Sequence, residues 1–128
     1  MKALRALGLL ALVLALGTCA DGPRPGWLEV RLVSPNADDG GVLFTVTGGP
    51  IDSVRSSFPD FYTQRQGDTW HVLVAGAPVV GVIAEIWVPD IRAAASYGGT
   101  VEQAAHVSTY AQRATAGYQV SIGRPLME

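Results

Sequence analysis

The sequence predicts a small all-β domain that follows a hydrophobic leader. From residue 27 onward, short runs of alternating apolar and polar residues are separated by clusters of Gly, Pro, Asn and Asp. Alternation with period two is typical of half-buried strands, and regular turn signals between such runs are typical of sandwiches. We therefore expect an immunoglobulin-like β-sandwich of about seven or eight strands with one short helix. The chain has one cysteine, so it lacks the Cys–Trp–Cys pattern of a true immunoglobulin domain.

The first 18 residues have the composition of a secretory signal peptide. Lys2 and Arg5 supply a positive start, and residues 6–16 form an apolar run rich in Leu and Ala. This run is shorter than the roughly 20 residues that a membrane-spanning helix needs, and it matches the apolar core of a signal peptide. We expect residues 1–18 to direct export and then to be removed.

Cys19 directly follows Leu16-Gly17-Thr18. A leucine three residues before a cysteine, with small residues between them, resembles the lipobox of bacterial lipoproteins. The resemblance implies cleavage before Cys19, acylation of its thiol and freed amine, and a membrane-anchored lipoprotein on the periplasmic or cell-surface face of the envelope. Two or three acyl chains hold a protein stably, whereas one binds only marginally. An ordinary secreted protein with an incidental cysteine, or an uncleaved anchor, is also compatible with these residues.

The rest of the chain divides into a tether, one domain and a short tail. Residues 19–26 are rich in Pro and Gly, which favours an extended tether. Residues 27–123 have the length of a single domain, and residues 124–128 form the tail. Without the leader, the nine basic residues of the chain fall to seven, against eleven acidic ones. A net negative charge with no basic stripe argues against nucleic acid as a partner.

Two strands are predicted on either side of a turn at Ser34 to Gly41. In residues 27–32 and in residues 42–47, every second side chain is apolar and faces the core, and the side chains between them face away from it. Each pattern fits a strand with one buried face. The predicted core-facing side chains are Leu28, Val30, Leu32, Val42, Phe44 and Val46.

The middle of the chain has weaker signals. Residues 51–57 are predicted as a poorly defined strand, and residues 58–62 as an aromatic-rich crossing segment. A turn at Gln66-Gly67-Asp68 precedes a strand over 69–75, because Gly and Asp favour turns. In that strand Trp70, Val72 and Val74 point one way, and His71 and Leu73 point the other.

Residues 79–88 are the longest apolar run after the leader, and only Glu85 is charged. Such a run predicts a central strand that is buried on much of both faces. Pro89 ends it, and Asp90 is a suitable N-cap for a helical turn over 91–95.

The last third contains one ambiguous segment. Residues 97–105 are predicted as a strand, because Gly98-Gly99 precedes alternating residues. Residues 102–111 also fit an amphipathic helix, so both assignments stay open within 97–113. Residues 118–122 alternate clearly and form the last predicted strand.

Three of these segments resemble the cohesin and carbohydrate-binding-module group of bacterial sandwiches. They are Leu28-Glu29-Val30, the turn from Asn36 to Gly40, and Val42 to Val46, followed later by Gly81 to Ala84. Val88-Pro89-Asp90 is similar to a segment of small envelope lipoproteins. The resemblance covers most of the domain and implies the sandwich fold, and it carries over no binding residues.

The turn that contains Asn36, Asp38 and Asp39 offers oxygen ligands of the kind that Ca²⁺ prefers. It lacks the regular Asp spacing and the closing Glu of an EF-hand loop, and turn chemistry alone explains the same residues. We therefore expect no metal or other cofactor, with this turn as a weak calcium candidate.

No sequence motif points to catalysis. His71 and His106 are the only histidines, and neither has a metal ligand at a suitable spacing. There is no Gly-x-Ser-x-Gly nucleophile motif and no phosphate-binding Gly-rich loop. We expect a non-catalytic protein with no catalytic residues.

Aromatic side chains are the remaining candidates for ligand or partner contact. They are Trp27, Phe58, Phe61, Tyr62 and Trp87. Exposed aromatic rings could anchor a protein partner or stack on sugars, or they could plug the ends of the sandwich. Arg55, Arg65 and Arg113 could pair with acidic residues or bind an anion.

These observations favour a membrane-held envelope lipoprotein that acts as a protein-interaction module. The partner would bind at an open strand edge or an aromatic patch. Alternatives are a glycan-binding module that uses the exposed aromatics, and a small envelope hydrolase.

Overall fold

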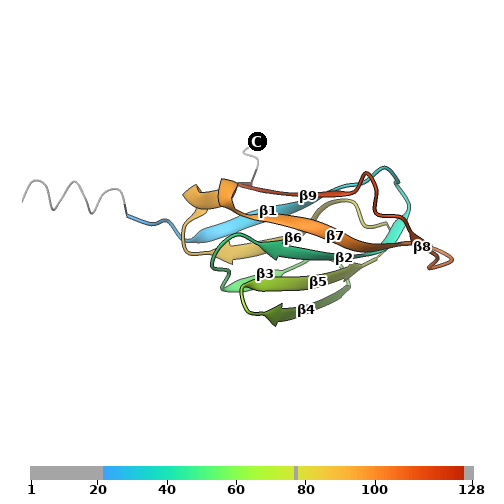
Figure 1. Ribbon diagram of the computed structural model, residues 1–128, viewed down its shortest axis with the longest axis horizontal. Coiled ribbons are helices and arrows are strands. Elements are labelled where there is room, and N and C mark those ends of the chain that lie inside the picture. Colours follow the sequence, from blue (N-terminus) through green and yellow to red (C-terminus); the bar gives the residue numbers. More distant parts are fainter. Residues whose placement is uncertain (1–21, 77, 126–128) are drawn as a thin grey trace, which may run out of the picture.

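The computed structural model describes residues 22–76 and 78–125 (Figure 1). The predicted signal peptide and Cys19 lie outside these residues. Nearly all regular structure in the described chain is β-strand, with one short 3-10 helix, which confirms the all-β prediction. Its elements are β1 (Gly26–Val33), β2 (Asp39–Thr47), β3 (Ser53–Arg55), β4 (Asp60–Gln66), β5 (Thr69–Ala75), β6 (Gly81–Val88), the 3-10 helix η1 (Ile91–Ser96), β7 (Gly98–His106), β8 (Gln112–Arg113) and β9 (Gln119–Gly123).

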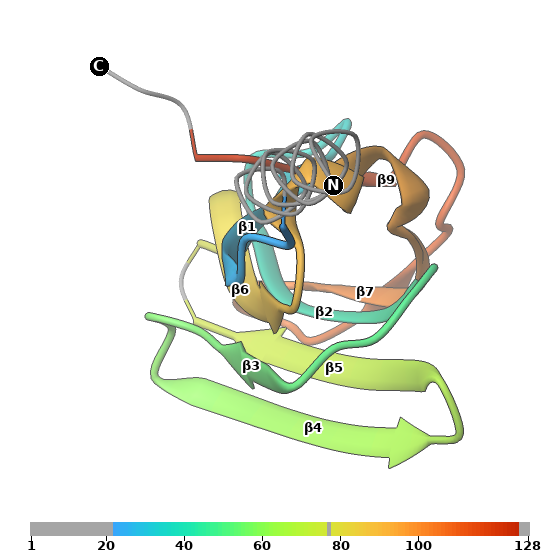
Figure 2. The same cartoon turned by 90° about the vertical axis from the view of Figure 1, so that its left-hand side faces the viewer.

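The strands form one antiparallel sheet in the order β3-β6-β1-β9-β7-β2-β5-β4, with β8 paired to β7. The view along the molecule in Figure 2 shows these strands curled around a common interior. The architecture is therefore nearly a barrel, and it is not clearly divided into the two layers of the expected sandwich.

The two halves of the sheet meet at a narrow seam between β7 and β9. One residue pair, Gly99 with Val120, joins these strands. A Cβ atom on Gly99 would lie 2.4 Å from the Thr45 carbonyl oxygen and 3.0 Å from Val120 Cγ1. Real Cβ atoms essentially never lie 2.4 Å from a backbone oxygen, so the close packing of β7 against β2 beside this seam requires glycine at position 99.

The core follows the alternation of the predicted strands. All six core-facing residues predicted for β1 and β2 are buried, and Val72 and Val74 of β5 are fully buried with them. Ile83 and Ile86 of β6 close the interior from the other half of the sheet. Burial of apolar area contributes about 25 cal/mol per Å², so this continuous cluster is the main source of stability.

Two predictions for the C-terminal half of the chain are confirmed. Asp90 accepts a hydrogen bond from the Arg92 backbone N–H at 3.0 Å and caps η1, as expected. The ambiguous segment contains strand β7, which confirms the strand assignment over 97–105.

The prediction for residues 58–62 is wrong. Asp60 begins the seven-residue strand β4, which pairs with β5 from Asp60–Ala75 to Gln66–Thr69. The weak strand predicted over 51–57 is reduced to the three residues of β3. Sequence alternation fails in β4 because it lies at the end of the sheet and is exposed along almost its whole length.

Candidate functional site

The outer face of β4, β5, β2 and β7 carries a row of three apolar side chains and one glutamine. Tyr62 lies opposite Leu73, Leu73 opposite Leu43, and Leu43 opposite Gln103. Tyr62 is 64% exposed and Leu73 is 37% exposed. Side chains directly opposite each other in antiparallel strands touch, so the row is a continuous strip of surface across four strands. We call Tyr62, Leu73, Leu43 and Gln103 the outer row.

A hollow lies beside the outer row. The next row of the same face consists of small residues, with Gly41 between Ala75 and Ala105. The resulting depression has a volume of about 230 Å³ and is lined by Gly41, Leu43, Leu73, Gln103, Ala104, Ala105, Tyr110 and Gln112. Apolar side chains form most of its lining, and Gln103 and Gln112 contribute polar groups.

Tyr110 lines this hollow from the turn between β7 and β8. The residue is 75% exposed, and its backbone has φ 56°, in the left-handed region. A bulky residue rarely adopts this conformation, which costs about 1–3 kcal/mol and persists only when its surroundings enforce it. The Tyr110 N–H donates to the His106 carbonyl at 3.0 Å, and the His106 N–H donates to the Ala111 carbonyl at 3.0 Å.

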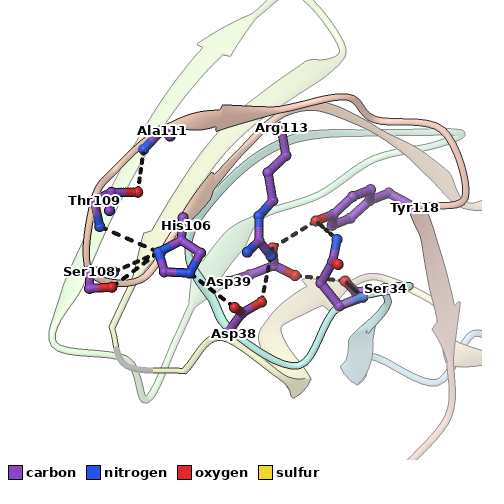
Figure 3. Close-up of polar contacts among 10 residues, drawn as sticks. Ser34, Asp38, Asp39, His106, Ser108, Thr109, Ala111, Arg113 and Tyr118 are labelled. Carbon is purple, nitrogen blue, oxygen red and sulfur yellow. Dashed lines mark hydrogen bonds and ion pairs between the residues drawn. The ribbon is translucent and has the colours of Figure 1, made fainter.

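The side chain of His106 fixes the same turn. Its Nδ1 atom accepts hydrogen bonds from the backbone N–H groups of Ser108 at 3.1 Å and Thr109 at 3.4 Å. Its Nε2 atom lies 3.0 Å from Asp38 Oδ2 (Figure 3). His106 therefore connects the turn that presents Tyr110 to the start of β2.

A buried carboxylate lies at the base of this connection. Asp39 has no exposed surface. It accepts hydrogen bonds from Ser34 Oγ at 2.6 Å, the Tyr118 hydroxyl at 2.7 Å and Arg113 Nη1 at 3.0 Å (Figure 3). Buried charges are tolerated when they are paired and hydrogen-bonded, and these three donors meet that requirement.

Arg113 bridges the two adjacent carboxylates. Its Nη1 atom lies 2.7 Å from Asp38 Oδ1 as well as 3.0 Å from Asp39 Oδ1. The hydrogen bond from Arg113 holds the pKa of Asp38 below its ordinary value, and the hydrogen bond to Asp38 raises the pKa of Arg113. Asp38 and Arg113 are thus charged near neutral pH, and the contacts of Arg113 with Asp38 and Asp39 tie β8 to the start of β2.

The three residues of the weak calcium candidate all have partners within the chain. Asp38 and Asp39 both face Arg113, and the Asn36 amide donates to the Tyr118 hydroxyl at 2.9 Å. The arginine occupies the place that a cation would take between the two carboxylates. Within residues 22–76 and 78–125, no group of three or more His, Cys, Asp or Glu side chains could hold a metal ion.

His106, Ser108 and Asp38 form an arrangement that superficially resembles a hydrolytic triad. Ser108 Oγ lies 3.2 Å from His106 Nδ1, and Asp38 lies on the other ring nitrogen. A general base needs a free lone pair on the nitrogen that faces the nucleophile. Here that lone pair already accepts two backbone N–H groups, so the geometry is that of a turn cap. His71 lies apart from it, 3.7 Å from Glu102.

The five predicted aromatic residues are not brought together. Trp27 and Trp87 meet edge to face across β1 and β6, with centroids 5.3 Å apart and planes at 73°. The Arg55 guanidinium lies 3.7 Å from the Trp27 ring and pairs with Glu85. Both tryptophans are therefore partly covered.

The other three aromatic residues divide between core and surface. Phe58 and Phe61 are half-buried against the core, whereas Tyr62 is exposed on the outer row. Leu43, Leu73 and Tyr110 were missed as candidates. The outward direction of Leu43 and Leu73 was visible in the alternation, but their alignment across β2 and β5 depends on register.

No helix in the described part of the chain has the length and hydropathy to cross a membrane. Comparisons of the chain with protein-family models, with curated proteins and with solved structures found no match.

Proposed function

We propose that the protein is an envelope lipoprotein that is anchored through acylated Cys19 and binds a protein partner without catalysis. The lipobox-like Leu16-Gly17-Thr18-Cys19 and the leader before it support the anchor. The outer row and the adjoining hollow support the binding surface.

The single observation that carries the interaction is the apolar strip in which the exposed side chains of Tyr62 and Leu73 lie beside the half-buried Leu43. Contiguous apolar surface rimmed by polar groups marks interaction sites on otherwise soluble domains. Tyrosine is also among the side chains that contribute most at interfaces. Tyr110 supports the same reading, because a strained backbone conformation that the fold enforces often belongs to a functional contact.

The position of the site suits a protein held at a membrane. The chain enters the domain at Gly26, and Figure 1 shows β8 at the opposite end of the molecule. A tether that begins at Cys19 would therefore hold the Tyr110 turn away from the membrane, where an envelope partner can reach it.

The test is site-specific photo-crosslinking in intact cells. A photoreactive amino acid replaces Leu73 or Tyr110, and Ser121 on β9 is the exposed control position. We expect one discrete protein adduct from the first two positions, none from Ser121, and loss of the Tyr110 adduct when Leu73→Asp is added. In Cys19→Ser cells the adduct should also decrease. Equal capture from all positions would contradict the proposal.

The glycan-binding alternative makes a different prediction in the same experiment. Flat aromatic platforms stack on sugar rings, and the edge-to-face Trp27–Trp87 pair presents no such platform. Recovery of polysaccharide in place of protein from Tyr110 would replace the protein-partner proposal with the glycan alternative.

A further inference from the structure

We propose that a second copy of this chain pairs with β4, strand against antiparallel strand, about a two-fold axis at Thr63. The two sheets would then form one continuous sheet. This inference rests on the proposed function, because it assumes that the protein is held on a membrane. It identifies a second copy of the chain as the partner of β4, the strand at the edge of the binding face.

β4 is the long open edge of the sheet. It ends the strand path and pairs only with β5 among the described strands, in seven consecutive residue pairs without a bulge. The other end of the path, β3, has only three residues. Natural edge strands are usually protected by proline, bulges or inward-pointing charges. β4 has no proline, no glycine and no bulge, and its charged residues are Asp60 at its start and Arg65 on the same face as Phe61.

The geometry of a continuous sheet restricts the register. Side chains alternate between the two faces of a strand, so opposite residues must lie on the same face. The two-fold axis must therefore lie at a residue that pairs with the same residue of the second copy. It cannot lie midway between two consecutive residues. An axis at Thr63 pairs all seven residues of β4, from Asp60 with Gln66 of the second copy to the reciprocal pair at the other end.

Neighbouring registers are less favourable. An axis at Tyr62 brings Pro59 into the ladder, and proline has no N–H to donate. An axis at Gln64 extends the ladder into the turn at Gly67 and sets Asp60 opposite Asp68 of the second copy, and like charges directly opposite each other are destabilising. The sequence of β4 therefore favours the register centred on Thr63.

The side chains are compatible in this register. Thr63 meets Thr63, Tyr62 meets Gln64, and Phe61 meets Arg65, so no two like charges are opposed. Threonine pairs and arginine on an aromatic ring are favourable cross-strand contacts. Because Tyr62 belongs to the outer row, the two outer rows would lie on the same face of the joined sheet and could bind a partner with two sites.

The size of the contact explains why the membrane matters. Stable interfaces bury about 800 Å² on each partner, and a single seven-residue strand pair supplies less than this. Confinement to one surface raises the effective concentration of the two copies. We therefore expect pairing in the envelope and monomers after the lipid anchor is removed.

Disulfide trapping tests the register directly. Opposite residues in antiparallel strands have Cα atoms about 4.5–5.5 Å apart, within the range that a disulfide spans. Because acylation consumes the Cys19 thiol, Thr63→Cys introduces the only free cysteine. Ser53→Cys on β3 is the matched control, because Ser53 is also an exposed edge-strand residue.

We expect envelopes with Thr63→Cys to give about tenfold more disulfide-linked dimer after mild oxidation than those with Ser53→Cys. The Cys19→Ser, Thr63→Cys double variant should lose this excess. If Thr63→Cys gives no excess while the Leu73 crosslinker still captures a different protein, pairing of two copies is overturned and the proposed function stands. If the Leu73 and Tyr110 crosslinkers capture nothing, the proposed function itself fails. A photoreactive residue at Thr63 that links to another protein would assign the edge to that protein instead.

Discussion

Arg113 Nη1 lies 3.0 Å from the Oδ1 atom of Asp39, a carboxylate with no exposed surface. These residues are 74 positions apart in sequence, and their contact fixes β8 against the start of β2. Asp38 and His106 extend the connection to the turn that carries Tyr110. The buried charge therefore positions an exposed side chain of the candidate binding surface.

Replacing Asp39 should be far more damaging than replacing Asp38. Asp39→Asn removes the charge that faces Arg113 and disturbs the bonds from Tyr118 and Ser34. Loss of one partner of a buried pair costs about 3–5 kcal/mol, so the free energy of unfolding in urea should fall by about that amount. Asp38→Asn, at an exposed carboxylate, is the matched control and should change it much less. Equal effects of the two variants would show that Asp39 has no special role.

The seam of the barrel gives a second matched pair of variants. Gly99→Ala places a methyl group against the Thr45 carbonyl oxygen, whereas Gly98→Ala meets nothing within 4 Å. Overpacking of this kind costs about 1–3 kcal/mol. We expect Gly99→Ala to lower the free energy of unfolding by about 2 kcal/mol and Gly98→Ala to leave it nearly unchanged. A Gly99→Ala protein as stable as Gly98→Ala would mean that residue 99 does not lie as close to Thr45 of β2 and Val120 of β9 as described.

Asp90 should contribute to acid sensitivity. The hydrogen bond from the Arg92 side chain lowers the pKa of Asp90 from 3.8 to about 2. A carboxyl whose pKa is lower in the folded than in the unfolded protein stabilises the fold at any pH above its unfolded-state pKa. This stabilisation is lost as the pH falls through the folded-state pKa. The urea midpoint should therefore fall between about pH 4 and pH 2 partly because of Asp90.

Asp90→Ser isolates the charge from the cap. Serine can still accept the Arg92 backbone N–H, as an N-cap should, but it does not titrate. We expect a smaller decrease of the urea midpoint on acidification than in the unmodified protein. An unchanged decrease would exclude Asp90 as its source.

Tyrosine at position 110 should lower the free energy of unfolding and contribute to partner binding. Asparagine tolerates the left-handed conformation better than tyrosine, so Tyr110→Asn should raise the free energy of unfolding by about 0.5–1 kcal/mol. The same variant should reduce the protein adduct formed from position 73. Gln112→Asn is the neighbouring control and should not stabilise the protein. Undiminished crosslinking in Tyr110→Asn would remove Tyr110 from the binding surface.

The sequence was informative wherever one face of a strand is buried. Leu28, Val30, Val42 and Phe44 were assigned to the core from alternation alone, because burial of one face imposes a period of two. β4 escaped the same reasoning because six of its seven residues are exposed and only Phe61 is half-buried. Its residues therefore carry no periodic signal, although β4 forms seven pairs with β5.

The candidate site was less predictable because it depends on which residues of neighbouring strands lie opposite each other. Trp27 and Trp87 were chosen singly as exposed aromatics, but pairing of β1 with β6 sets them against each other. The turn around Asp39 was recognised as acidic, but its partners Arg113 and Tyr118 come from the last part of the chain. Local patterns do not reveal contacts between residues so far apart in sequence.

Anchoring through Cys19 is the step on which the interaction and the pairing of β4 both depend. The most direct test is the intact mass of the protein extracted from membranes, with Cys19→Ser as the control. We expect a chain that begins at Cys19 and carries two or three acyl chains, and an unprocessed or unanchored chain for the control. A mature protein with a free thiol at Cys19, or one that retains residues 1–18, would contradict the account.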